Sequence, residues 1–259
     1  MTKTLLASAA VALCILAPGS ARAQFNQYWL PVEQGRLDSH VELQMQYSRL
    51  EAANEDLNVV ILGVEAQYAI KDRFEVGLNV PALVKSYATG VGFSESDAAF
   101  GNIMLNLKAR LFSIGEVLSL AAYTNVMLPT HSEADSRKYT MLVPGVAATG
   151  KLLGVLVGGG LGLVWFAIGD DMPDSALITA DVYGGYSLFG ILTFKLALQY
   201  ANSFKPDSDT WGLGITPGLE VDLLDIVRVG AAVRIATNDE ALVLYGGRAA
   251  LLVHGGISF

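Results

Sequence analysis

The final segment of the chain has an apolar or small residue at every second position. From Ala241 to Phe259, every odd-numbered position holds an apolar or small residue, and the even-numbered positions include Arg248, His254 and Ser258. A period of two places successive side chains on opposite faces of a β-strand. The segment therefore predicts a strand with one apolar face and one partly polar face.

Eleven earlier segments alternate in the same way, which predicts twelve strands. In the first of them, Val41 and Leu43 share one face, while Glu42 lies on the other. The sixth and seventh segments are the least regular, because proline and glycine obscure which face is which. The expected strands are residues 36–48, 57–70, 74–85, 99–112, 117–129, 140–150, 155–168, 177–188, 191–204, 210–223, 226–237 and 241–259.

The stretch from Leu152 to Ile168 has a second interpretation as a membrane helix, because its seventeen residues are uncharged. A helix needs about 20 apolar residues to span a bilayer, and five of these seventeen are glycine. A turn at Gly154 followed by a glycine-rich strand is the preferred interpretation. No G-x-G-x-x-G spacing occurs there, so a nucleotide-binding loop is not predicted.

The connections between the expected strands alternate between tight and longer ones. Tight connections lie near residues 71–73, 113–116, 150–154, 187–190 and 224–225, and longer polar ones near 49–56, 86–98, 130–139, 169–176, 205–209 and 238–240. Outer-membrane barrels have short periplasmic turns, longer external loops and an even number of strands. We therefore expect an all-β fold: a single antiparallel transmembrane β-barrel of about twelve strands, closed by the first and last strands.

A soluble barrel is the alternative, and the charge content argues against it. Charged residues make up 16% of this chain, against about 25% in ordinary soluble domains. In the membrane interpretation, apolar residues form an outward band about 25 Å tall. The residues expected in this band are Leu105, Leu107, Leu120, Phe194, Leu196, Leu198, Leu213, Val229 and Val233.

The N-terminal residues predict a cleaved signal peptide. Lys3 precedes an apolar run, and Ala21-Arg22-Ala23 forms a cleavage site. We expect a signal peptide at 1–23, a pre-barrel periplasmic or plug segment at 24–35 that carries Trp29, and the barrel at 36–259. A periplasmic arm is preferred to a plug, because so short a segment would fill only one end of a barrel. Cleavage would remove Cys14, the one cysteine of the chain.

The longer connections carry most of the negative charge. Counted with Lys85, they hold fourteen acidic and five basic residues. A nucleic-acid-binding protein would need a basic surface instead, so no nucleic-acid partner is expected. The densest acidic run, Asp170-Asp171-x-x-Asp174, could bind a divalent cation, but a solvated loop is preferred because no ligand spacing is complete. No metal and no cofactor are expected.

The same alternation places a set of ionisable residues on the lumen face. They are His40, Glu42, Glu65, Glu75, Lys108, Arg110, Asp181, Lys195, Glu220, Asp222, Arg228, Arg234, Arg248 and His254. Two roles are open for them: ion pairs that brace a narrow barrel, or a polar path for a solute. Twelve strands lie between filled barrels of about eight and open porins of about 16–18, so a narrow, partly occluded pore is expected.

Two histidines mark the seam where the first and last strands should meet. His40 and His254 are expected inside the lumen near the periplasmic mouth, with Glu42 and Arg248 paired slightly higher. Because histidine titrates near neutrality, the cluster could form a proton-sensitive constriction. The preferred interpretation is a polar cluster that fixes the register of the seam.

A membrane-embedded hydrolase is an alternative from another functional class. A serine nucleophile needs a base within hydrogen-bond reach. The chain has three histidines and no G-x-S-x-G motif, and Ser39 alternates to the face opposite His40. No catalytic residue is predicted, which leaves a channel or a structural or adhesive barrel without transport.

Three short motifs resemble a known family. Residues 68–81 read Y-A-I-K-D-R-F-E-V-G-L-N-V-P, Gly101-Asn102 precedes the next strand, and Leu128-Pro129-Thr130 follows later. These motifs are similar to those of the transporter-like outer-membrane family linked to the MetA pathway of phenol degradation. Asn102 stands where that family has Asp, and His131-Ser132 stands where it has Gly-Asp.

The resemblance implies a porin-like channel or transporter for aromatic or other apolar small molecules. It implies a location in the outer membrane of a Gram-negative bacterium. The expected partners are outer-membrane lipid, a small-molecule solute and the barrel assembly machinery, which reads a final strand with an aromatic end such as Phe259.

Overall fold

The computed structural model describes most of the chain after the N-terminal region. The described residues are 37, 39–52, 55–71, 73–90, 93–99, 101–115, 117–130, 139–169, 176–205, 208–223, 226–238 and 248–259. The expected signal peptide, the pre-barrel segment with Trp29 and the acidic run from Asp170 to Asp174 lie outside these residues.

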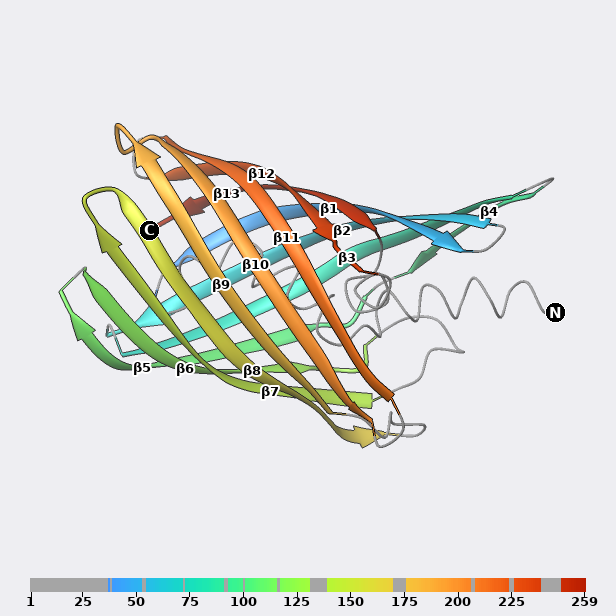
Figure 1. Cartoon of the computed structure of the whole chain (residues 1–259), viewed down its shortest axis with the longest axis horizontal. Coiled ribbons are helices and arrows are strands. Elements are labelled where there is room, and N and C mark those ends of the chain that lie inside the picture. Colours follow the sequence, from blue (N-terminus) through green and yellow to red (C-terminus); the bar gives the residue numbers. More distant parts are fainter. Residues whose placement is uncertain are drawn as a thin grey trace.

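The described residues form one closed antiparallel sheet (Figure 1). Its strands are β1 (His40–Ala52), β2 (Glu55–Ile70), β3 (Phe74–Gly90), β4 (Phe93–Ala99), β5 (Met104–Ile114), β6 (Leu118–Met127), β7 (Tyr139–Leu152), β8 (Val155–Gly169), β9 (Ala176–Leu188), β10 (Leu192–Lys205), β11 (Ser208–Leu223), β12 (Val227–Ala236) and β13 (Ala249–Ser258). β1 pairs with β13 from His40 opposite Ser258 to Arg49 opposite Ala249. This pairing closes the barrel.

The fourth strand of the wall is divided in two. The outer part of β3 pairs with β4, and its inner part pairs with β5. Between these two parts, the Gly101 N–H donates to the Pro81 carbonyl at 2.9 Å. Pro81 has no N–H of its own, so it cannot supply a ladder hydrogen bond at the break. β4 and β5 occupy one position in the wall, and the predicted barrel of twelve strands is confirmed.

The five tight turns that the sequence predicts lie together at one end of the barrel, the turn end. In four of them an N–H donates to the carbonyl three residues earlier, at 3.0 to 3.2 Å. Leu153 and Gly154 have φ values of 52° and 79°, and Phe189 and Gly190 follow the same pattern. Two consecutive positive φ values match the twist of antiparallel strands. The predicted turn at Gly154 is therefore confirmed.

Residues 155–169 form the strand β8, so the helical interpretation of this stretch is wrong. No helix among the described residues is long and apolar enough to cross a bilayer.

Three of the predicted longer loops are wrong, because strands run through most of their residues. β1 and β2 are separated by residues 53–54, β3 and β4 by 91–92, and β10 and β11 by 206–207. Backbone pairing continues beyond the apolar band, where polar side chains no longer mark a strand by hydrophobic alternation. The β3–β4 hairpin reaches beyond the rest of the wall in Figure 1. The last strand, predicted at 241–259, is β13 from Ala249 to Ser258, and residues 241–247 lie outside the described residues.

The outward face of the wall is apolar. Seven of the nine residues expected in the lipid-facing band are 37–51% exposed, and the other two, Leu120 and Leu213, are half-buried. Soluble proteins rarely expose apolar patches larger than a few hundred Å². A continuous apolar outer wall is instead typical of a transmembrane barrel, so the soluble-barrel alternative is wrong.

Candidate functional site

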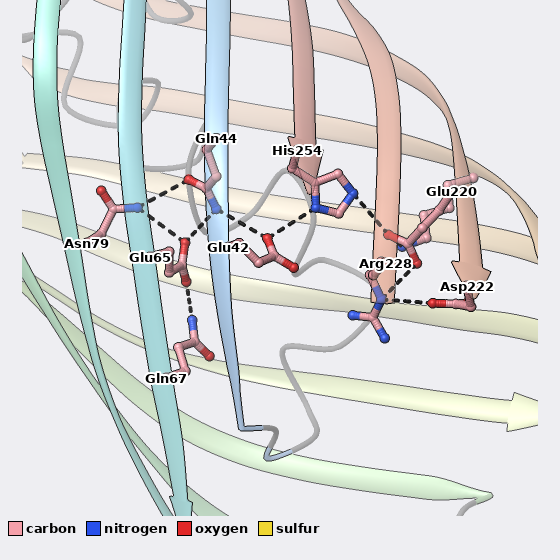
Figure 2. A network of polar contacts seen from close by, with 10 residues as sticks. Glu42, Gln44, Glu65, Gln67, Asn79, Glu220, Asp222, Arg228 and His254 are labelled. Atoms are coloured by element: carbon pink, nitrogen blue, oxygen red, sulfur yellow. Dashed lines mark hydrogen bonds and ion pairs between the residues drawn. The ribbon is translucent and has the colours of Figure 1, made fainter. Parts of the chain in front are cut away.

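A continuous set of polar contacts runs along the inner face of the wall near the turn end (Figure 2). The set crosses the seam between β1 and β13, and we call it the seam network. Its members are Glu42, Gln44, Glu65, Gln67, Asn79, Lys195, Glu220, Asp222, Arg228 and His254. Most of these side chains are buried, because their strand positions alternate with outward apolar ones.

His254 is the link across the seam. Its Nδ1 lies 3.1 Å from Oε2 of Glu42 on β1, and its Nε2 lies 3.5 Å from Oε2 of Glu220 on β11. The first contact is a hydrogen bond and the second has ion-pair distance only. A protonated imidazole carries donors on both nitrogens. One side chain on β13 can therefore hold a carboxylate on either side of the seam.

On one side of His254, two bases neutralise two acids. Lys195 Nζ lies 2.7 Å from Glu220 Oε2, and Arg228 Nε lies 3.4 Å from Glu220 Oε1. Arg228 Nε also donates to Asp222 Oδ1 at 3.1 Å. Burial makes an unpaired charge costly, so this arrangement depends on all four partners.

On the other side of His254, amide groups surround a carboxylate. Glu65 Oε2 accepts from Gln44 Nε2 at 2.8 Å and from Asn79 Nδ2 at 3.2 Å, and Glu65 Oε1 accepts from Gln67 Nε2. Gln44 Nε2 also lies 3.5 Å from Glu42 Oε2, which joins Glu65 to the seam. These amides are missing from the predicted lumen set, because that set holds ionisable residues alone. Their inward positions follow from the same alternation.

The remaining predicted lumen residues lie around this network. Glu75 on β3 pairs with Lys108 on β5 at 2.7 Å. His40, Asp181 and Arg234 are buried on β1, β9 and β12, and Arg110 is half-buried beside a bulge in β5. Arg248 precedes β13 and is exposed. A lumen-lining role for the full set stays a prediction.

The predicted pair between Glu42 and Arg248 is wrong. Glu42 lies opposite Gly256 in the seam, and its partner is His254. Arg248 lies at the far end of β13, just before Ala249 pairs with Arg49. Alternation predicts which face of a strand a residue occupies, but it does not predict how far one strand is shifted along the other.

Another part of the inner wall is apolar. Six side chains from β6 to β10 cluster toward the end of the barrel opposite the turns, and each is at most 6% exposed. We call them the apolar patch: Met127, Met141, Val143, Val164, Leu177 and Ala201. These strands include the sixth and seventh predicted segments, whose faces the sequence left unclear.

Two tyrosines pack over glycines on the inner wall. A Cβ at Gly145 would overlap the ring of Tyr123, and a Cβ at Gly158 would overlap the ring of Tyr183. The Tyr183 hydroxyl donates to the Ala148 carbonyl at 3.1 Å. These glycines of β7 and β8 thus leave room for aromatic rings against the wall.

Neither hydrolase chemistry nor a metal centre emerges from the described residues. The Ser39 hydroxyl accepts a hydrogen bond from the Ala69 N–H at 2.9 Å, so it supports the pairing of β1 with β2. Among the residues that the structure describes, no group of three or more His, Cys, Asp and Glu side chains could hold a metal ion.

The comparisons with known proteins show the fold. No family model and no curated protein matches this sequence. The COG4313 outer membrane channel from Pseudomonas putida F1 is similar in structure, with a TM-score of 0.67 and 12% identity over 86% of this chain and 96% of that one.

Two porins are also similar in structure. The NanC porin has a TM-score of 0.54 and 10% identity over 85% of this chain and 98% of its own. The KdgM porin, solved in complex with disordered oligogalacturonate, has a TM-score of 0.53 and 8% identity over 84% and 99%. This chain therefore has the fold of outer-membrane channels and porins.

Proposed function

We propose that the protein is a narrow passive channel for small aromatic or apolar molecules in the outer membrane of a Gram-negative bacterium. The observation that carries this proposal is the two-sided lumen. The apolar patch lies toward one end of the barrel, and the seam network lies near the turn end. Small-molecule sites are mostly apolar with a few placed polar groups, and this inner wall has that composition.

Two further observations support the proposal. The barrel shares its fold with an outer membrane channel and with porins. The motif at residues 68–81 resembles the MetA-linked family, which implies aromatic or apolar solutes. An apolar solute that enters from the loop side would meet the apolar patch and lose unfavourable contact with water there.

Export and assembly complete the proposal. The signal peptide at 1–23 would direct the chain across the inner membrane. Phe259 ends the seam strand, and its N–H donates to the Ser39 carbonyl at 3.0 Å. Its side chain is 71% exposed, so the aromatic end is accessible to assembly machinery.

Uptake by cells tests the proposal. A Gram-negative host without its major porins would express the barrel, and uptake of a labelled aromatic alcohol would be compared with uptake of a sugar of similar size. We expect faster uptake of the aromatic compound alone. Leu177→Asn should reduce this uptake several-fold, because it places an amide in the apolar patch.

Ser203→Asn is the matched control, because Ser203 lies directly opposite Leu177 and is already polar. Equal uptake with and without the barrel would contradict the channel and favour a structural barrel. Release of fatty acid from phospholipid by the purified protein would instead favour the hydrolase alternative.

A further inference from the structure

Asp181 differs from every other acid of the predicted lumen set. Glu42, Glu75, Glu220 and Asp222 each have a basic partner within 4 Å, and Glu65 accepts hydrogen bonds from three amides. Within the described part of the chain, Asp181 forms no ion pair. Its carboxylate accepts a backbone hydrogen bond from Gly160, and its Oδ2 has no hydrogen-bond partner. The side chain is only 4% exposed.

The surroundings of Asp181 include both apolar and polar side chains. Leu177 and Ala201 of the apolar patch lie toward the loops, and Tyr183 with Ala197 lies toward the turns. Ala201 is opposite Thr179. Thr179 lies two residues from Asp181 along β9, so their Cα atoms are about 7 Å apart. The carboxylate therefore lies at the edge of the apolar patch.

A second acceptor lies beside this carboxylate in the sheet. Gln199 on β10 is directly opposite Asp181. A carboxylate and an amide oxygen together suit a ligand with several hydrogen-bond donors.

We propose that Asp181 and the apolar patch form a subsite for a small amphipathic amine, with the ammonium group on Asp181 and the apolar body on the patch. This inference rests on the proposed function, because it names a substrate class for the same lumen. A buried carboxylate without a counter-charge is unfavourable, and a bound cation would compensate it. An ammonium group carries three donors, and a carboxylate accepts hydrogen bonds from such a group.

The net charge of the chain favours the same class. The chain has a formal net charge of −8. A negative field at the mouth of a channel raises the local concentration of cations. Cationic solutes would thus be gathered at the mouth and then held at the edge of the apolar patch.

Calorimetric binding to the full-length barrel in lipid nanodiscs tests the subsite. Phenethylammonium is compared with 2-phenylethanol, which has the same apolar body and no charge, and empty nanodiscs give the background for each. We expect the wild-type barrel to bind the ammonium compound about tenfold more tightly, as a charge-assisted hydrogen bond implies. Asp181→Asn should remove this difference and leave the binding of the alcohol unchanged.

Glu95→Gln is the matched control, because it also removes one negative charge and lies in β4, outside both the seam network and the apolar patch. Equal binding of the two compounds by the wild-type barrel would overturn the subsite, whatever the variants do. A preference that survives Asp181→Asn would also overturn it and assign the effect to the acidic loops. Either result leaves the uptake of neutral aromatic compounds, and so the proposed channel, untouched.

Discussion

At the scale of single residues, glycine decides where aromatic rings can lie. Tyr183 occupies the space over Gly158 and bonds Thr149 Oγ1 at 2.6 Å. Tyr123 occupies the corresponding space over Gly145. The glycine-rich run in β8 therefore leaves space for the ring of Tyr183 on the neighbouring strand β9, and this explains why the apolar alternation of β8 is weak.

Gly158→Ala should impair the barrel. The new methyl group would overlap the Tyr183 ring and the Ala148 carbonyl, and overpacking of this kind costs about 1–3 kcal/mol. We expect a lower midpoint when the folded barrel is unfolded by heat in detergent and scored by its gel mobility. Tyr183→Ala in the same chain should restore part of the loss.

Gly184→Ala serves as the control, because the nearest atom to its Cβ would be the Leu156 carbonyl oxygen at 3.8 Å. If Gly158→Ala and Gly184→Ala melted alike, the packing of Tyr183 would not be the reason for glycine at position 158.

At the scale of elements, the register of β1 with β13 sets the whole seam network. Val41 lies opposite Ile257, and both side chains are on the outward face. The Phe259 N–H donates to the Ser39 carbonyl, so Ser39 and Phe259 form a hydrogen-bonded pair. Such pairs recur at every second residue of an antiparallel ladder, and the next one is Val41 with Ile257. The Cα atoms of such a pair are about 5.5 Å apart, which is within the range of a disulfide.

Cysteines at positions 41 and 257 should therefore form a disulfide. The variant with Val41→Cys and Ile257→Cys should oxidise to a cyclised chain with altered mobility on a denaturing, non-reducing gel. Cys14, the native cysteine, lies in the expected signal peptide. Val41→Cys with Val253→Cys is the control, since its partners are shifted by four residues, or about 13 Å. Efficient closure of the control pair instead would place the seam in another register.

The elements themselves were largely predictable from the sequence, because alternation and turn residues are local signals. The five tight turns and the closed barrel follow from them. The strand β4 was not predicted, because residues 86–98 were expected to form a polar loop before the strand at 99–112. The partner of Glu42 was not predicted either, because strand stagger depends on the closed barrel and not on any single strand.

At the scale of the whole molecule, the apolar outer band should make the barrel sensitive to charge according to depth. Leu196 lies in β10 within this band and is 51% exposed. Leu196→Arg should destabilise the barrel by about 2–4 kcal/mol, as arginine does near the midplane of a bilayer. Unfolding in urea from lipid vesicles, followed by tryptophan fluorescence, measures this change.

Leu153→Arg is the control, because Leu153 lies at the tip of a turn and is 90% exposed. Near the interface the same substitution should cost about 0–1 kcal/mol. Equal losses at the two positions would contradict the placement of the band across the membrane.

The contact between Glu42 and His254 has a consequence for the order of folding. It joins residues 212 positions apart, so it forms only after almost the entire chain has been inserted. Before that moment, Glu42 and Glu220 belong to two separate half-networks, and both free sheet edges are exposed to lipid at high cost. The meeting of the first and last strands satisfies the edges and the charges together. Closure is therefore a cooperative final step, and a partly closed wall is not a stable intermediate of assembly.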